Sequence, residues 1–399
     1  MDIKLNAADE AFRREVKKFL AEHVPPSPIL NRSQRFGGQI NTIGNWQKVL
    51  YEKGWSAPNW PKQYGGTGWN ETQKHIWYEE STIAGAPGGN GFGLHMAGPV
   101  IYTFGTDAQK EQHLKGILSG EISWCQGYSE PGAGSDLASL KTSAMREGDD
   151  YIVNGQKIWT SFAHLADWMF CLVRTDSSGK PQEGISFLLI DMKTPGIEVR
   201  PIVSIDHEHH LNEVYFTDVR VPVTNRVGEE NKGWTYAKFV LANERTGIAG
   251  VAGRKIHLKK LKELASLEYA SDGRKLAEEE AFQRRLADLE IRLMALEITS
   301  LRILSDVAAG REPGPGASSL KIFATEISQE LETMTLEAAA HYALPRQNEI
   351  IHGGNESGQS GPHYLAEAYI AYAIGRASTI YGGTNEIQRN VIAKSVLGL

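Results

Sequence analysis

Two carboxylates occupy settings that suit acid–base chemistry. Glu386 follows a glycine pair in IYGGTNEIQRN, residues 380–390, where the chain enters a predicted helix. Glu244 lies inside VLANERTGIAG, a predicted helical stretch of apolar and small residues in which an acid is unusual. Burial would raise the pKa of Glu244 and make it a potential base, whereas pairing with Arg245 would lower that pKa. On their own, these residues fit a buried base and a surface ion pair equally well.

The stretch YSEPGAGSD, residues 128–136, follows a predicted strand and forms a loop that can approach a bound group. Gly132 and Gly134 let the backbone come close, while Ser129 and Ser135 offer hydroxyls and amides to a phosphate or a ring edge. The loop lacks the third glycine of a dinucleotide fingerprint, and no helix clearly follows it. A cofactor loop and an ordinary turn are equal interpretations of these residues.

The sequence QKIWTS, residues 156–161, has the alternation of a β-strand. On such a strand Trp159 and Ser161 share one face, where an indole can stack on a flat cofactor beside a hydroxyl group. A tryptophan on a strand more often belongs to the hydrophobic core, and the segment alone favours that interpretation.

The cluster DHEHH, residues 206–210, holds three histidines and two acids and invites a metal interpretation. Its spacing matches no common metal site, and neighbouring positions of a strand point to opposite faces. We therefore predict a polar hairpin loop here, and no metal site.

The length and charge of the chain narrow its class. At 399 residues it can form two or three packed units, and its net charge of -6 provides no basic surface for nucleic acid. Cys125 and Cys171 lie in apolar stretches and suit a reducing compartment rather than a disulfide framework. The first residues do not resemble a signal peptide, and no apolar run approaches the roughly 18 residues of a membrane span. These features predict a cytoplasmic protein without membrane insertion and without nucleic-acid partners.

The order of elements predicts an α+β fold with three domains. Amphipathic helical patterns fill residues 1–120. Short apolar or alternating runs separated by turn residues fill residues 121–231 and predict an antiparallel β domain. Long helical patterns return in residues 232–399 and predict a helical bundle.

Two local signals give sharper expectations. Asn6 precedes an acidic first turn with Asp9 three residues later, which predicts a capped helix from this point. Asn154-Gly155 lies between apolar runs and is a strong signal for a two-residue hairpin turn.

Four motifs occur together in an order and spacing typical of one family. They are YSEPGAGSD, NGQKIWTS, the run FTDVRVP followed by VGEENKGW, and YGGTNEIQR. On these motifs the chain resembles the acyl-CoA dehydrogenase family over nearly its full length. The resemblance implies an N-terminal helical domain, a central antiparallel β domain and a C-terminal four-helix bundle, with FAD held between the β domain and the bundles of two subunits. It also implies α,β-dehydrogenation of an acyl-CoA thioester to the trans-2-enoyl-CoA, with electrons passed to an electron-transferring flavoprotein.

The resemblance also assigns the catalytic groups. Most family members place the catalytic glutamate directly after the tyrosine of the YGGTNE loop, but this chain has Gly382 there. A minority place it on the first long helix of the bundle, before an arginine, and Glu244 with Arg245 matches that pattern. The resemblance thus implies that Glu244 takes the α-proton while the β-hydrogen leaves as hydride to flavin N5. The backbone N–H of Gly382 is then expected to bind the thioester oxygen as charge develops on it.

The other motif residues receive binding or structural roles from the same resemblance. With Glu244 as the base, Glu386 becomes a first-turn acid, and Asn385 and Gln388 have the spacing of a capping box. The implied substrate-binding residues are Arg245 and Ser135. Trp159 and Ser161 are expected beside the isoalloxazine ring and Thr384 near the phosphates or the ribityl chain, so that the implied cofactor-binding residues are Tyr128, Ser129, Gly134, Ser135, Trp159, Ser161 and Thr384.

The chain departs from the family where a neighbouring subunit normally binds the adenine half of FAD. Typical members carry Arg-x-x-Phe-Gly and Gln-x-x-Gly-Gly-x-Gly motifs, but residues 267–283 and 348–363 preserve neither, and Arg274 is at most a displaced remnant. A rearranged site in a homodimer or homotetramer and a heterotetramer with a second acyl-CoA dehydrogenase-like chain both explain this. The WPKQYGGTGW and NERTGIA runs resemble the large chain of pimeloyl-CoA dehydrogenase and the large chains of two-subunit steroid side-chain dehydrogenases.

Several alternatives stay open at the level of sequence. An acyl-CoA oxidase shares the first half-reaction, and a structural subunit of a heteromeric dehydrogenase shares the fold. The acyl group of the substrate is equally open between dicarboxylyl, long-chain and steroid classes.

Overall fold

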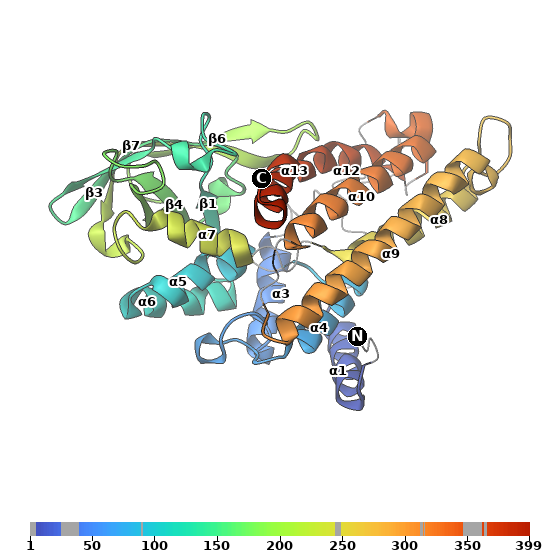
Figure 1. Ribbon diagram of the computed structural model, residues 1–399, viewed down its shortest axis with the longest axis horizontal. Helices are drawn as coiled ribbons and strands as arrows, with labels where there is room; N and C mark the ends of the chain where they lie inside the picture. The colour runs from blue at the N-terminus through green and yellow to red at the C-terminus, as the bar shows by residue number, and fades with distance from the viewer. Residues whose placement is uncertain are drawn as a thin grey trace. The chain divides into compact units, whose positions relative to one another are not determined.

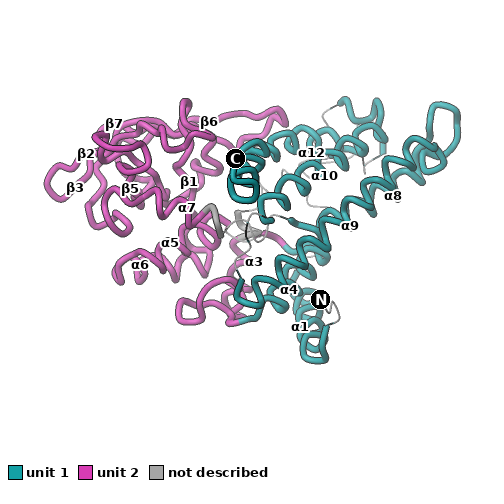
Figure 2. The backbone as a smooth tube through the Cα atoms, in the orientation of Figure 1, with its two compact units in different colours: residues 1–35, 69–86, 245–399 teal, residues 36–68, 87–244 magenta. Residues whose placement is uncertain are grey.

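The computed structural model describes residues 5–24, 40–88, 91–243, 249–311, 314, 316–345, 361–362 and 365–399. Contacts divide the chain into two compact units (Figure 2). Unit 1 comprises Met1–Arg35, Trp69–Ala86 and Arg245–Leu399, and unit 2 comprises Phe36–Gly68 and Pro87–Glu244. Each unit has a hydrophobic core of its own.

Unit 2 is built on a seven-stranded sheet (Figure 1). Its strands are β1 Trp124–Gly127, β2 Ser143–Glu147, β3 Asp150–Lys157, β4 Trp168–Arg174, β5 Ile185–Asp191, β6 Ile197–Val203 and β7 His209–Pro222. They lie in the order β1-β4-β2-β3-β7-β6, with β5 also paired to β4. Most pairs are antiparallel, as predicted, but β1 and β2 both run parallel to β4, with Trp124 opposite Trp168 and Ser143 opposite Arg174. A parallel pair needs a long crossover, and between β1 and β4 the strands β2 and β3 with their loops provide it.

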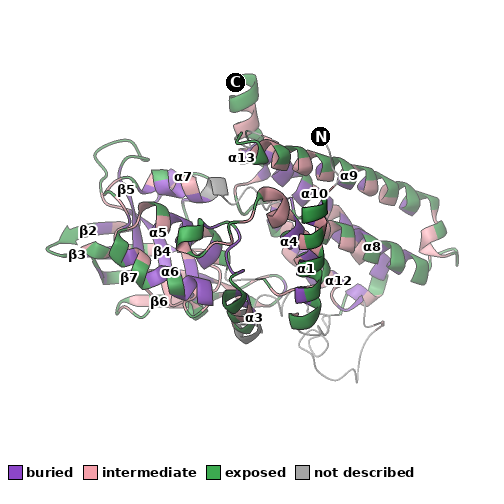
Figure 3. Ribbon diagram, turned by 90° about the horizontal axis from the view of Figure 1, so that it is seen from below, coloured by how far each residue is buried: buried purple, intermediate pink, exposed green. Residues whose placement is uncertain are grey.

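Strands β4 and β5 are buried on both faces. On β4, Met169 and Cys171 belong to one apolar cluster, whereas Phe170 and Leu172 belong to another, because successive side chains point to opposite faces. Helices α5 Gly98–Phe104, α6 Asp107–Ser119 and α7 Gly233–Asn243 pack on the second cluster (Figure 3). This double coverage explains why β4 and β5 are continuous apolar runs in the sequence.

The predicted hairpin at Asn154-Gly155 is wrong. These residues lie inside β3, and the chain reverses instead between Glu147 and Asp150, which are paired in register. Gly155 has φ 150°, and the register with β7 shifts just before it. A Cβ on Gly155 would approach Thr142 Cα to 2.7 Å, so the glycine permits a close backbone approach at a bulge rather than a turn.

The other helical elements of unit 2 include α3 Ile40–Lys53 and the π-helical turn η2 Gly93–Ala97. The start of α6 follows from a capping box, in which Gln109 N donates to Thr106 Oγ1 at 3.3 Å and Thr106 N donates to Gln109 Oε1 at 3.1 Å. The Gln109 amide also donates to the carbonyls of Thr224 and Arg226, at 2.7 and 3.0 Å. One side chain therefore both starts α6 and ties it to the segment after β7.

Unit 1 is helical. The α-helices among its described residues are α1 Ala7–His23, α4 Glu71–Ile83, α8 Val251–Leu267, α9 Glu280–Ala308, α10 Gly316–Ala339, α12 Ala368–Gly375 and α13 Asn385–Ile392. The predicted start of α1 is confirmed, since Asn6 Oδ1 accepts from Asp9 N at 2.9 Å. Near the centre of the unit α10 packs against α8, α9, α12 and α13. The fold is thus the predicted combination of N-terminal helices, a central β domain and C-terminal helices.

The helices of residues 1–120 are shared between the two units. Helices α1 and α4 belong to unit 1, where α4 packs against α8 and α9, while α3, α5 and α6 belong to unit 2. The domain boundaries at residues 120 and 231 describe sequence segments and stay a prediction.

Helix α9 is long and amphipathic. Its 29 residues begin where the Glu279 carboxylate accepts from Ala281 N and Phe282 N, at 3.1 and 2.6 Å. One face buries Phe282, Leu289, Leu293 and Leu296, whereas the other exposes Ile291, Met294 and Ile298. Across the described residues, no helix is long and apolar enough to cross a membrane.

A buried histidine makes the stability of unit 2 depend on pH. His113 is 1% exposed, and its ring meets Trp124 and Trp168 edge to face at centroid distances of 5.2 and 4.7 Å. Burial lowers the pKa of His113 to about 4. Because the folded pKa lies below the unfolded value of about 6.5, the unfolded chain takes up a proton first as pH falls, and stability is lost between these two values.

We predict that His113→Gln reduces the acid sensitivity of the protein. The wild type should lose about 2 kcal/mol more free energy of unfolding than the variant between pH 7 and pH 4.5, since glutamine binds no proton. Denaturant titrations at pH 7, 5.5 and 4.5 measure this difference. Parallel losses in both proteins would show that His113 is not the group responsible.

Candidate functional site

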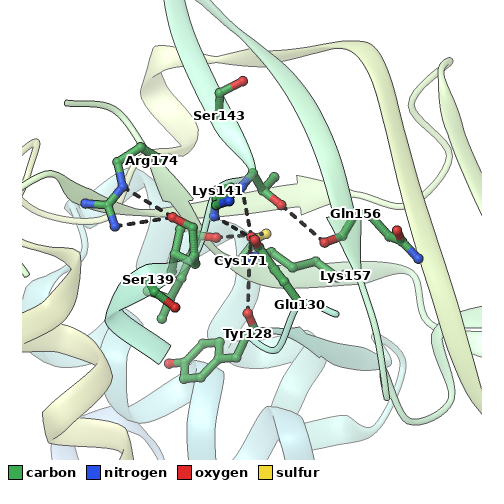
Figure 4. A network of polar contacts seen from close by, with 12 residues as sticks. Tyr128, Glu130, Ser139, Lys141, Ser143, Gln156, Lys157, Cys171 and Arg174 are labelled. Atoms are coloured by element: carbon green, nitrogen blue, oxygen red, sulfur yellow. Dashed lines mark hydrogen bonds and ion pairs between the residues drawn. The ribbon is translucent and has the colours of Figure 1, made fainter. Parts of the chain in front are cut away.

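A buried ion pair joins the loop after β1 to the end of β3 (Figure 4). Lys157 Nζ lies 2.8 Å from Glu130 Oε1, and the two side chains are 0% and 8% exposed. The ammonium also donates to the carbonyl of Tyr128 at 3.1 Å. Glu130 accepts from the backbone N–H groups of Lys141 and Thr142, at 2.6 and 2.9 Å. Each charge therefore has the additional hydrogen bonds that a buried pair requires.

The environment of Glu130 keeps it ionised. Burial raises the pKa of this carboxyl, whereas the Lys157 ammonium and the hydrogen bonds from Thr142 and Lys141 lower it. The lowering effects together are larger, so the pKa of Glu130 lies below its usual value. Glu130 is thus a structural acid. Sequence analysis missed this pair, although Lys157 occupies the inward face of β3 that it shares with Tyr151, which was the available signal.

The pair holds the 128–136 loop in one shape. Glu130 and Ala133 exchange two backbone hydrogen bonds of 3.0 Å, which close the turn around Gly132. The predicted cofactor residues on this loop range from buried to exposed: Tyr128 is buried, Ser129 is half-buried, and Gly134 and Ser135 are exposed. A Cβ on Gly134 would meet no atom within 4 Å, so this part of the loop borders open space.

The predicted strand position of Trp159 is wrong, and so is its alternative assignment to the core. Strand β3 ends at Lys157, and Trp159 adopts a left-handed backbone with φ 60° and is 58% exposed. Ser161 is half-buried in the turn that follows. Ile158 N donates to Ser129 O at 2.9 Å, so the segment lies beside the 128–136 loop. The structure therefore brings these predicted cofactor residues together, by a turn rather than a strand.

A hollow adjoins the loop. It has a volume of about 490 Å³ and is lined by Glu130, Pro131, Gly132, Ser139, Lys141, Thr142, Gly155 and Gln156. Gln156 Nε2 is already committed to Glu213 and to the Tyr215 hydroxyl, at 3.3 and 3.1 Å. Glu130 of the ion pair lines the hollow, while Gly134, Ser135 and Trp159 do not.

In unit 1, the loop before α13 has the backbone that its glycines allow. Gly382 and Gly383 have φ 66° and 81°, in the left-handed region that favours glycine. Thr384 is the N-cap, and its hydroxyl accepts from Ile387 N at 3.1 Å. Since Gly382 and Thr384 belong to unit 1, their part in a common site with the 128–136 loop stays a prediction.

The capping box predicted for Asn385 and Gln388 is wrong because Thr384 takes the capping position. Asn385 is buried instead, and its Oδ1 accepts from Lys321 Nζ at 3.0 Å and from Thr325 Oγ1 at 3.3 Å. This buried polar contact fixes the start of α13 on α10. A threonine directly before an asparagine had made the capping residue ambiguous in the sequence.

Glu386 is unsuited to act as a base. Its side chain is 79% exposed, and its own backbone N–H together with the Thr384 hydroxyl lowers its pKa. It therefore stays ionised as the first-turn acid that we predicted. Glu244 and Arg245 lie outside the described residues, which reach Asn243 at the end of α7, so their roles stay predictions.

Asp206, His207 and Glu208 of the DHEHH segment lie in the predicted hairpin turn between β6 and β7, and its last two histidines begin β7. Asp206 is buried, and its Oδ1 accepts from the Ser204 hydroxyl and from Glu208 N. Within the ranges that the structure describes, no group of three histidine, cysteine or acidic side chains can hold a metal ion.

Arg274 lies in the turn between α8 and α9. Its guanidinium forms an ion pair with Asp272 at 2.6 Å, and a second contact from Nε to the same carboxylate measures 2.8 Å. This partner already neutralises the arginine. Its role as a remnant of an adenine-binding motif stays a prediction.

Three family models together match most of the chain. The acyl-CoA dehydrogenase N-terminal domain matches residues 6–121, the middle domain residues 125–219, and the C-terminal domain residues 231–397.

Individual relatives are similar to this chain over nearly their whole length. Acyl-CoA dehydrogenase FadE26 of Mycobacterium tuberculosis is 34% identical, over 100% of this chain and 99% of its own. A chain in the crystal structure of the ChsE4-ChsE5 complex from the same organism is 33% identical, with a TM-score of 0.82 over 100% of this chain and 99% of that one. A chain of the Tcur3481-Tcur3483 steroid ACAD is 29% identical, with a TM-score of 0.84 over the same shares.

We predict that Lys157→Met destabilises the protein by about 3 to 5 kcal/mol, because it leaves the Glu130 carboxylate buried without its counter-charge. The double variant Glu130→Gln with Lys157→Met should recover part of this loss, since it removes the charge that needs a partner. Chemical denaturation measures the free energies of unfolding.

Lys193→Met provides the control, because Lys193 forms a 3.8 Å pair with Asp167 but is 81% exposed. Its loss should stay within about 1 kcal/mol, the usual value of an exposed pair. Equal losses at Lys157 and Lys193 would contradict the structural role of the buried pair.

Proposed function

The chain belongs to the acyl-CoA dehydrogenase family, and from this premise we propose that it catalyses FAD-dependent α,β-dehydrogenation of an acyl-CoA thioester to the trans-2-enoyl-CoA. The observation that supports it best is local to unit 2. There the exposed, left-handed Trp159 lies beside a loop that a buried ion pair holds in place. A large aromatic side chain that is both exposed and conformationally strained suits a platform for a flat cofactor.

The chain's own groups fit a flavin at this platform. Thr160 is 1% exposed, and its Oγ1 has no hydrogen-bond partner among the described residues. A buried hydroxyl of this kind is expected to find a partner, which a ligand edge can supply. Trp159 and Ser161 would hold the ring system, and Ser129, Gly134 and Ser135 the polar parts, with Tyr128 behind them. When bound, FAD supplies the acceptor for the β-hydrogen, which leaves as hydride.

The proton chemistry falls to Glu244, which we propose as the base that takes the α-proton. Glu386 is a poor alternative because it is exposed and its pKa is lowered. The backbone N–H of Gly382 makes no hydrogen bond to the backbone of another described residue. We assign it to the thioester oxygen, where a fixed donor lowers the cost of the charge that develops as the proton leaves. Arg245 and Ser135 are assigned to substrate binding.

The substrate class and the electron acceptor are further parts of the proposal. One similar structure is a steroid ACAD, and we propose a steroid acyl-CoA for this chain among the three classes that the sequence leaves open. We propose an electron-transferring flavoprotein as the acceptor, with an acyl-CoA oxidase as the alternative. Slow reoxidation of the reduced protein by dissolved oxygen supports a dehydrogenase, and rapid reoxidation supports the oxidase.

We also propose that the chain works in a heteromer with a second acyl-CoA dehydrogenase-like chain. Two similar solved structures are complexes of two differently named chains. The usual adenine-binding motifs are not intact in this sequence, and the guanidinium of Arg274 is paired with Asp272. On α9, Ile291, Met294 and Ile298 are 66%, 60% and 45% exposed at helical spacing, which suits a surface that another chain covers.

We predict that Glu244→Gln slows anaerobic reduction of the bound flavin by acyl-CoA at least about 1000-fold, since an amide cannot take the α-proton. Its FAD content should equal that of the wild type, because the substitution is isosteric. Stopped-flow absorbance of the flavin measures the rate.

Glu386→Gln is the matched control, as it makes the same change at the exposed acid of the other motif. It should stay within about threefold of the wild-type rate, because an exposed first-turn acid contributes little to the reaction. Slow reduction in Glu386→Gln with normal reduction in Glu244→Gln would reverse the assignment of the base.

For the heteromer, we predict that the chain purified alone carries less than one FAD per chain, even after incubation with excess FAD. Co-expression with its partner chain should restore one FAD for each complete site and increase the native mass. Flavin absorbance per chain and light scattering measure both quantities. A chain that is fully loaded alone, with normal turnover, would contradict this part of the proposal.

A further inference from the structure

The backbone around Trp159 is strained on both sides of one buried residue. Trp159 and Phe162 have φ 60° and 57°, and neither is a glycine. Between them Thr160 is buried, while Trp159 is largely exposed. Non-glycine residues persist in this region only where their surroundings over-determine the conformation. Some group must therefore hold the segment in place.

Asn212 on β7 holds the middle of the segment, at Thr160. The regular pairing of β3 with β7 ends at Lys157 and Val214, before the segment begins. Beyond that point, Thr160 N donates to Asn212 O at 3.0 Å, and Asn212 Nδ2 donates to Thr160 O at 2.9 Å. Both polar groups of the Thr160 backbone thus bind one residue, which is 0% exposed.

Two stacked histidines fix the orientation of the Asn212 amide. His164 Nδ1 lies 3.2 Å from Asn212 Nδ2, and His209 Nε2 lies 2.8 Å from Asn212 Oδ1. Since a carbonyl can only accept, the amide NH2 must face Thr160 O, which makes His164 Nδ1 the acceptor and His209 Nε2 the donor. The two imidazole rings stack with centroids 3.9 Å apart. A contact to the oxygen and a contact to the nitrogen therefore fix the orientation of the amide.

We propose that Asn212 is a positioning residue for the flavin, acting through Thr160 to hold Trp159 in its binding orientation, with His164 and His209 locking its amide. This inference rests on the proposed function, because it assigns the platform to a flavin. It goes further in naming a residue 52 positions away in the sequence, which need not touch the cofactor. A contact of purely structural value would stabilise the fold without changing the affinity for FAD.

A double-mutant cycle on FAD affinity separates the two roles. Apoprotein of the wild type, Asn212→Ala, Trp159→Ala and the double variant, each with its partner chain if one co-purifies, is titrated with FAD, and loss of flavin fluorescence gives each dissociation constant. We expect Asn212→Ala to weaken binding about 10-fold or more. In the Trp159→Ala background the same change should cost less than about threefold, because its effect passes through the side chain already removed.

Asn154 supplies the matched control. It is an asparagine on the neighbouring strand β3, and its side chain also holds a positive-φ residue, Asp218, by contacts of 2.9 and 3.0 Å. Asn154→Ala should leave the dissociation constant for FAD within about twofold of the wild type. If Asn212→Ala does not fold, His164→Phe replaces it, since that ring can still stack but offers no acceptor to the amide. We expect His164→Phe to weaken FAD binding by less than Asn212→Ala does, about threefold or more. In the Trp159→Ala background this loss of affinity should again disappear.

The outcomes are distinct. Strong coupling between Asn212 and Trp159 supports the inference, whereas equal fold-losses in both backgrounds, or an unchanged affinity in Asn212→Ala, overturn it while leaving the proposed function intact. A wild-type protein that does not bind FAD, alone or with its partner chain, overturns the proposed function and this inference with it.

Discussion

The buried pair of Glu130 and Lys157 is the contact on which the geometry of the candidate site depends. The two charges come from segments 27 residues apart, and each has further hydrogen bonds that make its burial tolerable. Because Lys157 ends β3 and Glu130 follows β1, the pair fixes where the 128–136 loop begins relative to the sheet. The open glycines and serines of the loop can then remain exposed without losing their position.

The Trp159 side chain is exposed to a ligand although its backbone is firmly held. Its indole is exposed and its backbone is left-handed, and both features reduce stability. Buried neighbours offset this loss of stability. Among them is Asn212, whose side chain bonds to the Thr160 carbonyl where the pairing of β3 with β7 has ended. On an extended strand the indole would lie on one of the two faces of the sheet. A strained turn holds it at the surface, next to the loop.

Local signals in the sequence predicted much of the fold and less of the site. The capped start at Asn6 and the helical character of unit 1 follow from spacing within a few residues. The parallel pairing of β1 with β4 depends on contacts between distant segments, and the role of Gly155 depends on the approach of Thr142, which lies just before β2. Trp159 was placed on a strand because alternation continued past Lys157, where tertiary hydrogen bonds, rather than the local pattern, end the strand. The family motifs supplied the list of site residues, while Glu130, Lys157 and Asn212 emerged only from their contacts.

The most direct test of the account is the visible absorption spectrum of the purified protein, with its partner chain if one co-purifies, before and after anaerobic addition of a steroid acyl-CoA. The account predicts a flavin spectrum that the thioester bleaches, since proton removal and hydride transfer together reduce the cofactor. A protein that retains its flavin colour with steroid, long-chain and dicarboxylyl acyl-CoA thioesters alike would contradict the central claim that this chain is an acyl-CoA dehydrogenase in activity as well as in family.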